Sequence, residues 1–571
     1  MLILGLNDGH DSGVALLRDS EVMYAANEER FSRVKNDSGF PELALGNLLK
    51  WNDVKPDDIG LLYVATESKP YIPPESDEYG AGDNLLAFCR NAFYMLAENT
   101  GNLMAHPWAV RAVRVSSRLL RNRKLLNANL EKFGLGNHKV RFVDHHLCHV
   151  LTGFASGSHE NQLSVSMDLG GDGYSAAVYT RKNGRIREVH RVPRMHSMGL
   201  FWYVVTEACG FHPDRHGGKI TGLAAYARGK EVYERIKGLY YYDGKAKTIK
   251  SSGKGHASQL RMMKELVDKY GMREVSSAAQ RLLEEVVTAF VSDYKRMTEC
   301  DEIICSGGVF ANVKLNQKIF EACRPAGMVV HAHMGDGGVG LGAAAKALYD
   351  TTGRLPVFRG AYLGAEYPLE GLEDLCGKYN LRCVRVNNIE EEIAARLAEF
   401  KVVCHYAGRS EYGPRALGNR SILFHGGDPS VNDWLNKKMK RSEFMPFAPA
   451  VLEGYERKCF HFDDALAKTS EFMTITVECT EWFKEKCPAT VHVDGTARPQ
   501  VVRKSVNPRF HAILAAYEKR TGIPAIINTS FNMHEEPIVE TPEDAMRAFV
   551  AMGVDYLAIG DYLITAGNSA G

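Results

Sequence analysis

The sequence contains no apolar run long enough to cross a membrane and no excess of either charge. Lysine plus arginine number 70 and aspartate plus glutamate number 69, whereas a dedicated nucleic-acid-binding or membrane-surface protein needs a basic excess. The opening stretch Met1–Leu6 lacks a basic n-region and turns polar at Asn7, so we expect no signal peptide. These absences favour a cytoplasmic protein with neither a nucleic-acid nor a membrane partner.

Cysteine is present but never in the spacing of a redox or zinc motif. The chain has 12 cysteines and no Cys-x-x-Cys pair; the closest two are Cys300 and Cys305. We predict reduced, mostly buried thiols, which is typical of cytoplasmic proteins.

The length and composition indicate a globular protein with more than one core. A chain of 571 residues exceeds what one hydrophobic core accommodates, and 45% hydrophobic with 24% charged residues is an ordinary globular composition. The character changes after Thr351–Pro356, where polar and basic motifs begin to accumulate. We therefore predict two domains, residues 1–355 and 356–571.

A strand, a polar glycine turn and a second strand occur twice in the first domain. Residues 2–17 and residues 163–179 both follow this plan, about 160 residues apart. The repetition predicts a duplicated α/β unit. In the actin-like and sugar-kinase-like class, two such halves face each other and use these hairpins to hold phosphate.

Four side chains could hold one metal ion. His145 and His149 are four residues apart, so on a helix both imidazoles share one face. Asp168 and Asp336 each follow an apolar strand in a glycine-rich turn. Two nitrogen and two hard oxygen ligands suit Fe(II), Mn(II) or Zn(II). The alternative is a structural histidine pair, which ordinary helices also contain.

Glycine turns in the first domain could bring backbone N–H groups to a nucleotide or phosphate. The candidate residues are Gly170, Gly171, Lys219, Gly222, Gly307, Gly308 and Asn312. The segment with Lys219 lacks the spacing of a Walker loop.

Basic side chains gather in loops of the second domain. They lie in residues 409–421, 437–449 and 496–501, and residues 526–532 add amide and hydroxyl groups at a strand end. Prolines and glycines pin these loops, which favours a polyanion pocket over scattered surface charge. In the first domain, residues 27–33 are either a charged helix start or a substrate-facing loop.

Taken in order, these motifs resemble the O-carbamoyltransferase family that includes the nodulation, cephem and tobramycin carbamoyltransferases. The motifs are Gly5-Leu6-Asn7 with His10, Asn27-Glu28-Glu29-Arg30-Phe31-Ser32, Asp144-His145-His146 with His149, Gly222-Leu223-Ala224-Ala225-Tyr226, Ser306-Gly307-Gly308-Val309, Gly413-Pro414-Arg415-Ala416-Leu417-Gly418, Pro446-Phe447-Ala448-Pro449 and Asn528-Thr529-Ser530-Phe531-Asn532. The resemblance implies an actin-like, sugar-kinase-like (ASKHA) first domain, similar to the tRNA threonylcarbamoyl-transferase, and a YrdC-like α/β second domain.

The resemblance also implies a two-step reaction. ATP and carbamoyl phosphate give carbamoyl-adenylate and pyrophosphate in the second domain, with Mg²⁺ accompanying ATP. The carbamoyl group then passes at the metal site to a hydroxyl of a small-molecule natural product, and AMP leaves. Family precedent favours Fe(II) as the metal.

Site roles follow from these two steps. For the first step we assign Arg415, Arg420, Lys440, Arg441, Arg498, Asn528, Ser530 and Asn532 to ATP and carbamoyl phosphate, with Lys440, Arg498 and Ser530 as catalytic groups. For the second step the glycine-turn residues would bind the adenylate, and His10 is the candidate general base, because neutral imidazole exists near pH 7. A hydrogen-bonded turn histidine is the alternative for His10. Asn27, Glu28 and Arg30 are candidate acceptor contacts.

Two other functions fit parts of the pattern. A threonylcarbamoyl-type tRNA modification enzyme would share both folds, but the balanced charge argues against a tRNA partner. A non-catalytic actin-like nucleotide-binding protein is the second. The chain length is also compatible with a homodimer.

Overall fold

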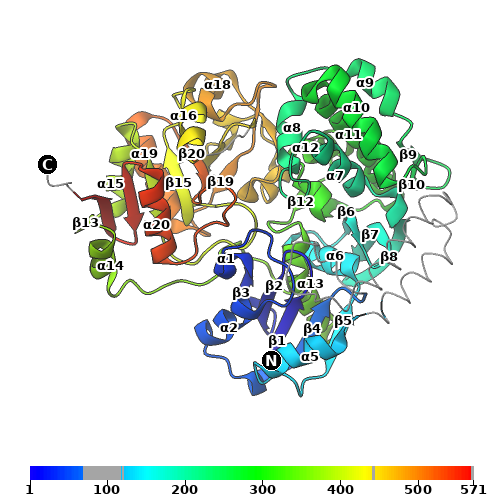
Figure 1. The fold of residues 1–571 in the computed structure, drawn as a ribbon, viewed down its shortest axis with the longest axis horizontal. Coiled ribbons are helices and arrows are strands. Elements are labelled where there is room, and N and C mark those ends of the chain that lie inside the picture. Colours follow the sequence, from blue (N-terminus) through cyan, green and yellow to red (C-terminus); the bar gives the residue numbers. More distant parts are fainter. Residues whose placement is uncertain (69–117, 119–120, 440–443, 568–571) are drawn as a thin grey trace. The chain divides into compact units, whose positions relative to one another are not determined.

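The computed structural model describes residues 1–68, 118, 121–439 and 444–567. The chain forms two compact units (Figure 1). Unit 1 comprises Met1–Met23 and Asn36–Val357, and unit 2 comprises Tyr24–Lys35 and Phe358–Gly571. Tyr24–Lys35, which the sequence analysis placed in the first domain, thus packs with the second unit. Lys440 and Arg441 lie outside the described residues.

Unit 1 contains two mixed five-stranded sheets with the same strand order. The first runs β3-β2-β1-β4-β5 and the second β8-β7-β6-β11-β12. In each sheet the first strand pairs antiparallel with its hairpin partner, and the other two strands join in parallel. This shared order shows the duplication that the two glycine hairpins predicted. The strands are β1 (Leu2–Asn7), β2 (Gly13–Arg18), β3 (Glu21–Asn27), β4 (Ile59–Ala65), β5 (Val140–Val143), β6 (Gln162–Gly171), β7 (Tyr174–Lys182), β8 (Arg185–Pro193), β11 (Glu302–Ser306) and β12 (Gly327–Val330).

Two helices connect the sheets of unit 1. Helix α6 (His145–Ser156) follows β5 and packs on β6 and β11, whereas α13 (Val339–Thr352) follows β12 and packs on β1 and β4. The two helices also pack on each other. Small residues allow this close contact: a Cβ on Gly342 of α13 would lie 2.1 Å from the carbonyl oxygen of Cys148.

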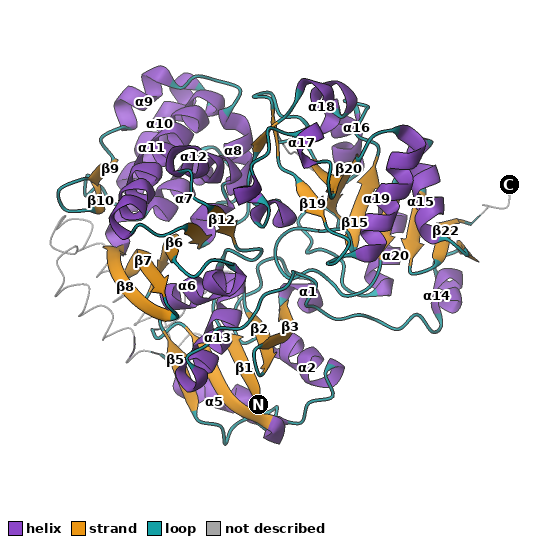
Figure 2. Ribbon diagram, turned by 180° about the vertical axis from the view of Figure 1, so that it is seen from behind, coloured by secondary structure: helices purple, strands orange, loops and turns teal. Residues whose placement is uncertain are grey.

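Most other described helices of unit 1, α7 to α12, lie between β8 and β12 in the sequence and form one helical bundle (Figure 2). The amphipathic stretch from Ser276 to Lys295 forms the central part of α11. The elements are α2 (Glu42–Trp51), α5 (Arg123–Glu131), α7 (Met198–Ala208), α8 (Gly217–Ala224), α9 (Lys230–Ile236), β9 (Tyr240–Asp243), β10 (Thr248–Ser251), α10 (His256–Tyr270), α11 (Met272–Thr298) and α12 (Val313–Cys323).

Unit 2 is built on one eight-stranded sheet, in the order β13-β22-β21-β14-β15-β20-β16-β19. Its strands are β13 (Leu381–Arg385), β14 (Val403–Tyr406), β15 (Arg420–Phe424), β16 (Ala448–Leu452), β19 (Gln500–Val502), β20 (Ala525–Ser530), β21 (Tyr556–Ile559) and β22 (Tyr562–Ala566). The other elements are α1 (Glu29–Ser32), α14 (Leu372–Lys378), α15 (Ile389–Ala398), α16 (Val431–Lys438), α17 (Glu456–Cys459), β17 (Val477–Glu478), α18 (Glu481–Lys486), β18 (Thr496–Ala497), α19 (Pro508–Thr521) and α20 (Pro542–Met552).

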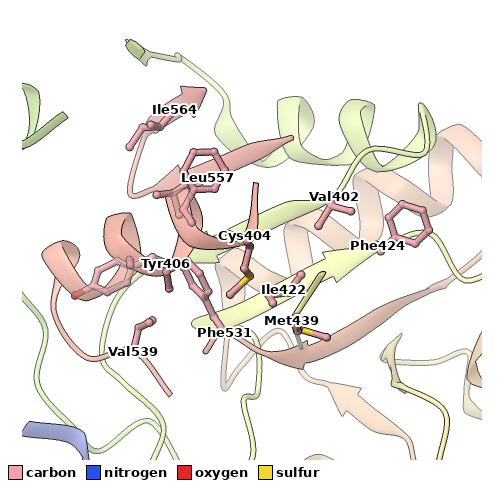
Figure 3. Close-up of a cluster of buried hydrophobic side chains, with 14 of the residues drawn as sticks. Val402, Cys404, Tyr406, Ile422, Phe424, Met439, Phe531, Val539, Leu557 and Ile564 are labelled. Atoms are coloured by element: carbon pink, nitrogen blue, oxygen red, sulfur yellow. The ribbon is translucent and has the colours of Figure 1, made fainter. Parts of the chain in front are cut away.

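Helices cover both faces of this sheet, so its strands are apolar on both sides. Cys404 and Ile422 face a cluster with α14, α16 and α20 (Figure 3), and the intervening Val403 and Leu423 face a cluster with α15 and α19. This alternation is the two-residue period of a strand. It explains why the strands read as continuous apolar runs.

Strand pairing brings one end of each of the eight strands of this sheet to the same edge. Neighbours across the sheet at this edge are Arg385, Tyr562, Ile559, Tyr406, Arg420, Ser530, Ala448 and Gln500. We call it the motif edge, because the basic and amide motifs of the second domain join the strands here.

None of the described helices is both long and apolar enough to cross a membrane.

The packing of α13 on β1 yields a stability prediction. A Cβ on Gly5 would lie 2.1 Å from the carbonyl oxygen of Gly340, so Gly5→Ala should lower the unfolding free energy of unit 1 by about 1–3 kcal/mol. Gly46→Ala is the control, because its Cβ would meet only Phe133 at 3.6 Å, inside helix α2 where alanine is favoured. Urea unfolding of both variants measures the difference. Equal stability of the two variants would contradict the tight contact.

Candidate functional site

Helix α6 carries both candidate histidine ligands on one buried face. Asp144 caps the helix by accepting a hydrogen bond from the Leu147 N–H at 3.0 Å. His145 and His149 are 5% and 1% exposed, and their Nε2 atoms are 3.2 Å apart. The four-residue spacing thus gives the geometry that it predicted.

Two carboxylates complete the cluster from separate elements. Asp168 Oδ2, on β6, lies 3.5 Å from His149 Nε2, and Asp336 Oδ1, which follows β12, lies 3.5 and 3.3 Å from the Nε2 atoms of His145 and His149. One candidate ligand atom of each residue lies within 4.8 Å of the others. The structure therefore brings together all four predicted metal ligands.

The spacing of these atoms fits a single ion. Two ligands about 2.1 Å from a tetrahedral ion are about 3.4 Å apart, which follows from ordinary zinc–nitrogen and zinc–oxygen distances. The four separations given above, 3.2 to 3.5 Å, match this value. A set of two imidazole nitrogens and two carboxylate oxygens also suits a divalent transition metal.

The pKa values of the side chains in this cluster depend on one another. Burial and the nearby Asp336 raise the pKa of Asp168. Burial alone would also raise the pKa of Asp336, but His145 and His149 hold it below its usual value. The pKa of His145 is raised, because Asp336 and Asp168 outweigh the opposing effect of burial. A divalent cation bound here would take the place of the imidazolium proton, because a ligating imidazole is neutral.

Backbone groups and glycines set the position of the ligands. Gly308 N–H and Leu169 N–H donate to Asp168 at 2.7 and 2.6 Å. Gly307 has φ +95°, and a Cβ there would lie 2.2 Å from the Met167 carbonyl oxygen. A Cβ on Gly171 would lie 2.2 Å from the His145 ring. Only glycine allows these close approaches.

The other predicted adenylate contacts lie in three different places: beside Gly171, at the start of α12 and within α8. Gly170, with φ +156°, immediately precedes Gly171. Asn312 caps α12 and exchanges hydrogen bonds with Gln280, so its side chain stabilises the helix start. Lys219 is buried in α8 with its ammonium 5.4 Å from the Phe211 ring centroid, and Gly222 lies in the same helix.

His10 lies beside the metal-ligand cluster. Its Nδ1 is 3.9 Å from Asp336 Oδ2. The Asn7 side-chain amide donates to the carbonyl oxygens of His10 and Asp336, at 2.9 and 3.2 Å, and so ties the two turns together. The structure thus places the candidate base next to a candidate ligand.

Asp172 is a positioning residue that the sequence analysis missed. Its carboxylate accepts hydrogen bonds from the N–H groups of Glu67, Ser68 and His145 at 3.1, 2.7 and 2.8 Å. It forms an acidic group with Glu67 and Asp144. Arg118 pairs with Glu67 and Arg191 with Asp144, so this second group anchors the start of α6. An aspartate in the same glycine turn as Asp168 was the available signal.

The motif edge of unit 2 gathers the predicted phosphate-binding loops. Gln500 donates to the Leu417 carbonyl oxygen at 2.6 Å and accepts from Asn528 at 2.7 Å. The Asn528 Oδ1 is buried and has no hydrogen-bond partner among the described residues. Arg415, Arg498 and Ser530 lie half-buried in this region.

Arg420 and Asn532, both predicted to bind ATP or carbamoyl phosphate, hydrogen-bond to backbone carbonyl oxygens. Arg420 is fully buried, and its guanidinium donates to the carbonyl oxygens of Ala407, Gly408 and Asn419. Asn532 donates to the carbonyl oxygens of Met533 and Glu536. Both side chains hold loops at the motif edge, and their contact with ATP or carbamoyl phosphate stays a prediction.

The contact of Asn27, Glu28 and Arg30 with an acceptor stays a prediction. All three are buried, and helix α1 starts directly after Glu28, which supports the helix reading over a substrate-facing loop. Arg30 donates to two carbonyl oxygens of unit 2.

A cavity of about 600 Å³ opens at the motif edge, over the β13–β14 half of the sheet. Three tyrosines, two arginines and an aspartate contribute to its lining: Tyr367, Tyr406, Tyr562, Arg385, Arg509 and Asp561. Within the described part of the chain, none of the predicted site residues lines it.

The structure therefore defines a two-unit α/β protein with mixed sheets, a candidate metal centre in unit 1 and a loop-rich sheet edge in unit 2. Family comparison identifies the class more closely. Residues 2–345 match the carbamoyltransferase N-terminus and residues 394–566 the carbamoyltransferase C-terminus. The chain belongs to the carbamoyltransferase family, and it is a carbamoyltransferase enzyme.

Related proteins align with this chain over most of their own length. An uncharacterized protein of Methanocaldococcus jannaschii is 30% identical over 99% of both chains. Nodulation protein NolNO of Sinorhizobium fredii is 28% identical over 99% of this chain and 82% of its own. Nodulation protein NolO of Bradyrhizobium diazoefficiens is 31% identical over 74% of this chain and 78% of its own.

Solved structures resemble the chain only distantly. Full-length HypF in a phosphate- and nucleotide-bound form has a TM-score of 0.32 and 12% identity, covering 61% of this chain and 56% of its own. This score is too low to define the fold, so the ASKHA and YrdC-like folds stay predictions.

The ligand cluster predicts metal content. Asp168→Asn and His149→Ala should each weaken metal binding by at least about 100-fold, because even outer partners of ligands contribute 10- to 100-fold. The control is His159→Gln, whose ring pairs with Glu302 away from the cluster. Elemental analysis of the dialysed proteins measures the ion. Full metal content in both ligand variants would contradict the site.

Proposed function

We propose that this carbamoyltransferase is ATP-dependent and transfers its carbamoyl group to a hydroxyl of a small-molecule natural product. The observation that carries the proposal is the convergence of four candidate metal ligands, with His10 beside them, in a chain of this family. The balanced charge of the chain, with 70 basic and 69 acidic residues, favours a small acceptor over a tRNA.

In the proposed first step, unit 2 joins the carbamoyl group of carbamoyl phosphate to the α-phosphate of ATP. The products are carbamoyl-adenylate and pyrophosphate. Water cleaves carbamoyl phosphate to carbamate and inorganic phosphate. A carbamate oxygen then attacks the α-phosphate of ATP, and the bond from that phosphate to the leaving pyrophosphate breaks. Both reactants are anions, so cationic groups must offset their repulsion and the charge of the leaving pyrophosphate. We assign this task to Arg415 and Arg498 at the motif edge. The sequence also assigns it to Lys440 and Arg441, which lie outside the described residues.

In the proposed second step, the acceptor oxygen attacks the carbamoyl carbon and the bond to the adenylate phosphate breaks, releasing AMP. His10 accepts the hydroxyl proton, and its distance of 3.9 Å from Asp336 supports this placement. A divalent ion held by His145, His149, Asp168 and Asp336 would stabilise the phosphate charge and polarise the carbonyl. Fe(II) is the predicted ion, with Mn(II) and Zn(II) as alternatives.

The direct test incubates the protein with ATP, Mg²⁺, carbamoyl phosphate and a panel of sugars and other alcohols. AMP release that depends on carbamoyl phosphate, and a product heavier by one carbamoyl group in mass spectrometry, are expected. Carbamoyl-phosphate-independent AMP release, or none with any alcohol, would reject the proposal.

Removing an edge arginine should impair the first step. Arg415→Ala and Arg498→Ala should each slow pyrophosphate formation by about 10²–10³-fold, the usual effect of deleting one group that stabilises transition-state charge. Arg457→Ala is the control, since Arg457 is exposed and pairs only with exposed Asp464 among the described residues. A coupled pyrophosphate assay measures the rate. Unchanged rates in both edge variants would exclude these arginines from the step.

Removing His10 should separate the two steps. His10→Asn should retain pyrophosphate formation and metal content, whereas carbamoylation of the acceptor should fall by about 10²–10⁴-fold, the contribution of a general base. Product and pyrophosphate are measured in the same reaction. If transfer proceeds at the wild-type rate, another group is the base.

A further inference from the structure

Tyr24–Lys35 is a segment of unit 2 that precedes most of unit 1 in the sequence. Three sets of hydrogen bonds hold it in unit 2. Ala25 N–H donates to the Leu363 carbonyl oxygen at 3.0 Å. Arg33 donates to the carbonyl oxygens of Pro537 and Ile538, at 2.7 Å each. Arg30 makes the third set.

Arg30 contacts the start of the loop from Glu411 to Arg420, which we call the Glu411–Arg420 loop. The Arg30 Nη2 donates to the carbonyl oxygens of Glu411 and Gly413 at 3.2 and 2.8 Å. Gly413 has φ +124°, a backbone conformation that other residues rarely adopt. One buried guanidinium nitrogen therefore bridges two carbonyls of a sharply turned backbone.

The Glu411 carboxylate holds the other end of the same loop. Its Oε1 accepts hydrogen bonds from the N–H groups of Leu417, Asn419 and Arg420, at 2.8, 2.8 and 3.1 Å. Arg415 lies between the two fastened ends. The side chain of Glu411 thus closes the loop, and Arg30 fixes the backbone from which that side chain projects.

Arg30 lies in a group of buried charged side chains. Glu411 and Glu540 are 2% and 1% exposed, whereas Arg30 and Arg420 are 4% and 0% exposed. Both arginines act electrostatically on Glu540. Burial raises the pKa of Glu540 although both arginines act to lower it. The Arg30 guanidinium also lies 3.9 Å from the Glu29 carboxylate, so removing Arg30 takes a buried cation away from these acids.

We propose that Arg30 is a positioning residue for the first step: it sets the Glu411–Arg420 loop so that Arg415 is presented to the phosphates at the motif edge. The inference rests on the proposed function for its kinetic part. The claim about the loop itself stands on the hydrogen bonds alone. In this view the Asn27–Ser32 motif serves co-substrate activation, and not acceptor binding.

The test compares full-length Arg30→Ala and Arg30→Lys with wild type. The control is Arg520→Ala, which removes an exposed arginine paired with Glu391 in the same unit. Lysine keeps the charge but replaces the planar guanidinium, so it separates charge balance from the two-carbonyl geometry. Metal content and circular dichroism verify that each protein is folded.

Hydrogen exchange of the substrate-free proteins reads out the loop. In Arg30→Ala, the amides of Leu417, Asn419 and Arg420 should exchange at least about 10-fold faster, because local opening becomes easier. Exchange elsewhere in unit 2 and in the control should match wild type. Wild-type exchange in the loop, or equal acceleration throughout unit 2, would overturn the positioning role.

Pyrophosphate kinetics read out the consequence. In Arg30→Ala, kcat/KM for ATP should fall by about 10–100-fold, the effect of a displacement near 1 Å at a reacting centre. Arg30→Lys should recover part of this loss, and Arg520→Ala should equal wild type. Unchanged kinetics would also overturn the proposal.

Two outcomes keep the tests separate. If wild type itself forms no pyrophosphate, the proposed function fails, while hydrogen exchange still decides the loop claim. If Arg30→Ala does not fold, Arg30→Lys decides on both readouts, with wild-type values contradicting the inference.

Discussion

The burial of two carboxylates beside two imidazoles is the constraint on which unit 1 depends. Asp168 and Asp336 would repel each other in a buried site without positive charge or N–H groups beside them. Asp168 receives two backbone N–H groups, and Asp336 lies against both histidine rings. A close fit of β6, α6 and the turn after β11 follows, and glycines at positions 171 and 307 are what permit it.

Duplication explains how this constraint is met. In the first half, the hairpin between β1 and β2 carries His10, and the helix after the last strand carries His145 and His149. In the second half, the hairpin strand β6 carries Asp168, and the turn into the corresponding helix carries Asp336. Each half thus contributes one hairpin and one helix start. Because α6 and α13 pack on each other, these parts converge without any long loop.

The sequence predicted features whose signal is local. Two such features are the four-residue spacing of histidines on an apolar helix and an acid at a strand end. Both can be recognised without knowing any distant contact, and the structure brings these residues together. Arg420 shows why the contacts of other residues cannot be predicted from the sequence alone. In a glycine- and proline-rich loop an arginine that binds phosphate and one that binds carbonyl oxygens look alike, and burial alone distinguishes them. The role of Arg30 had no local signal, because its partners follow Phe358.

The arginines of unit 2 differ in burial, and therefore in what their guanidinium groups can contact. A guanidinium has five donors, and when carbonyl oxygens take most of them in a buried site it cannot turn toward a ligand. Arg420 is in this condition, with three bonds to carbonyl oxygens. Arg30 is also buried and gives two of its donors to carbonyl oxygens, and both arginines hold the backbone around Arg415. Arg415 and Arg498 are only half-buried. A site for two polyanions needs strong positive charge at fixed positions, and long flexible side chains supply this only if their backbone is rigid. The buried arginines hold that backbone, so under the proposed first step a basic sheet edge would require more arginines than those that contact the phosphates.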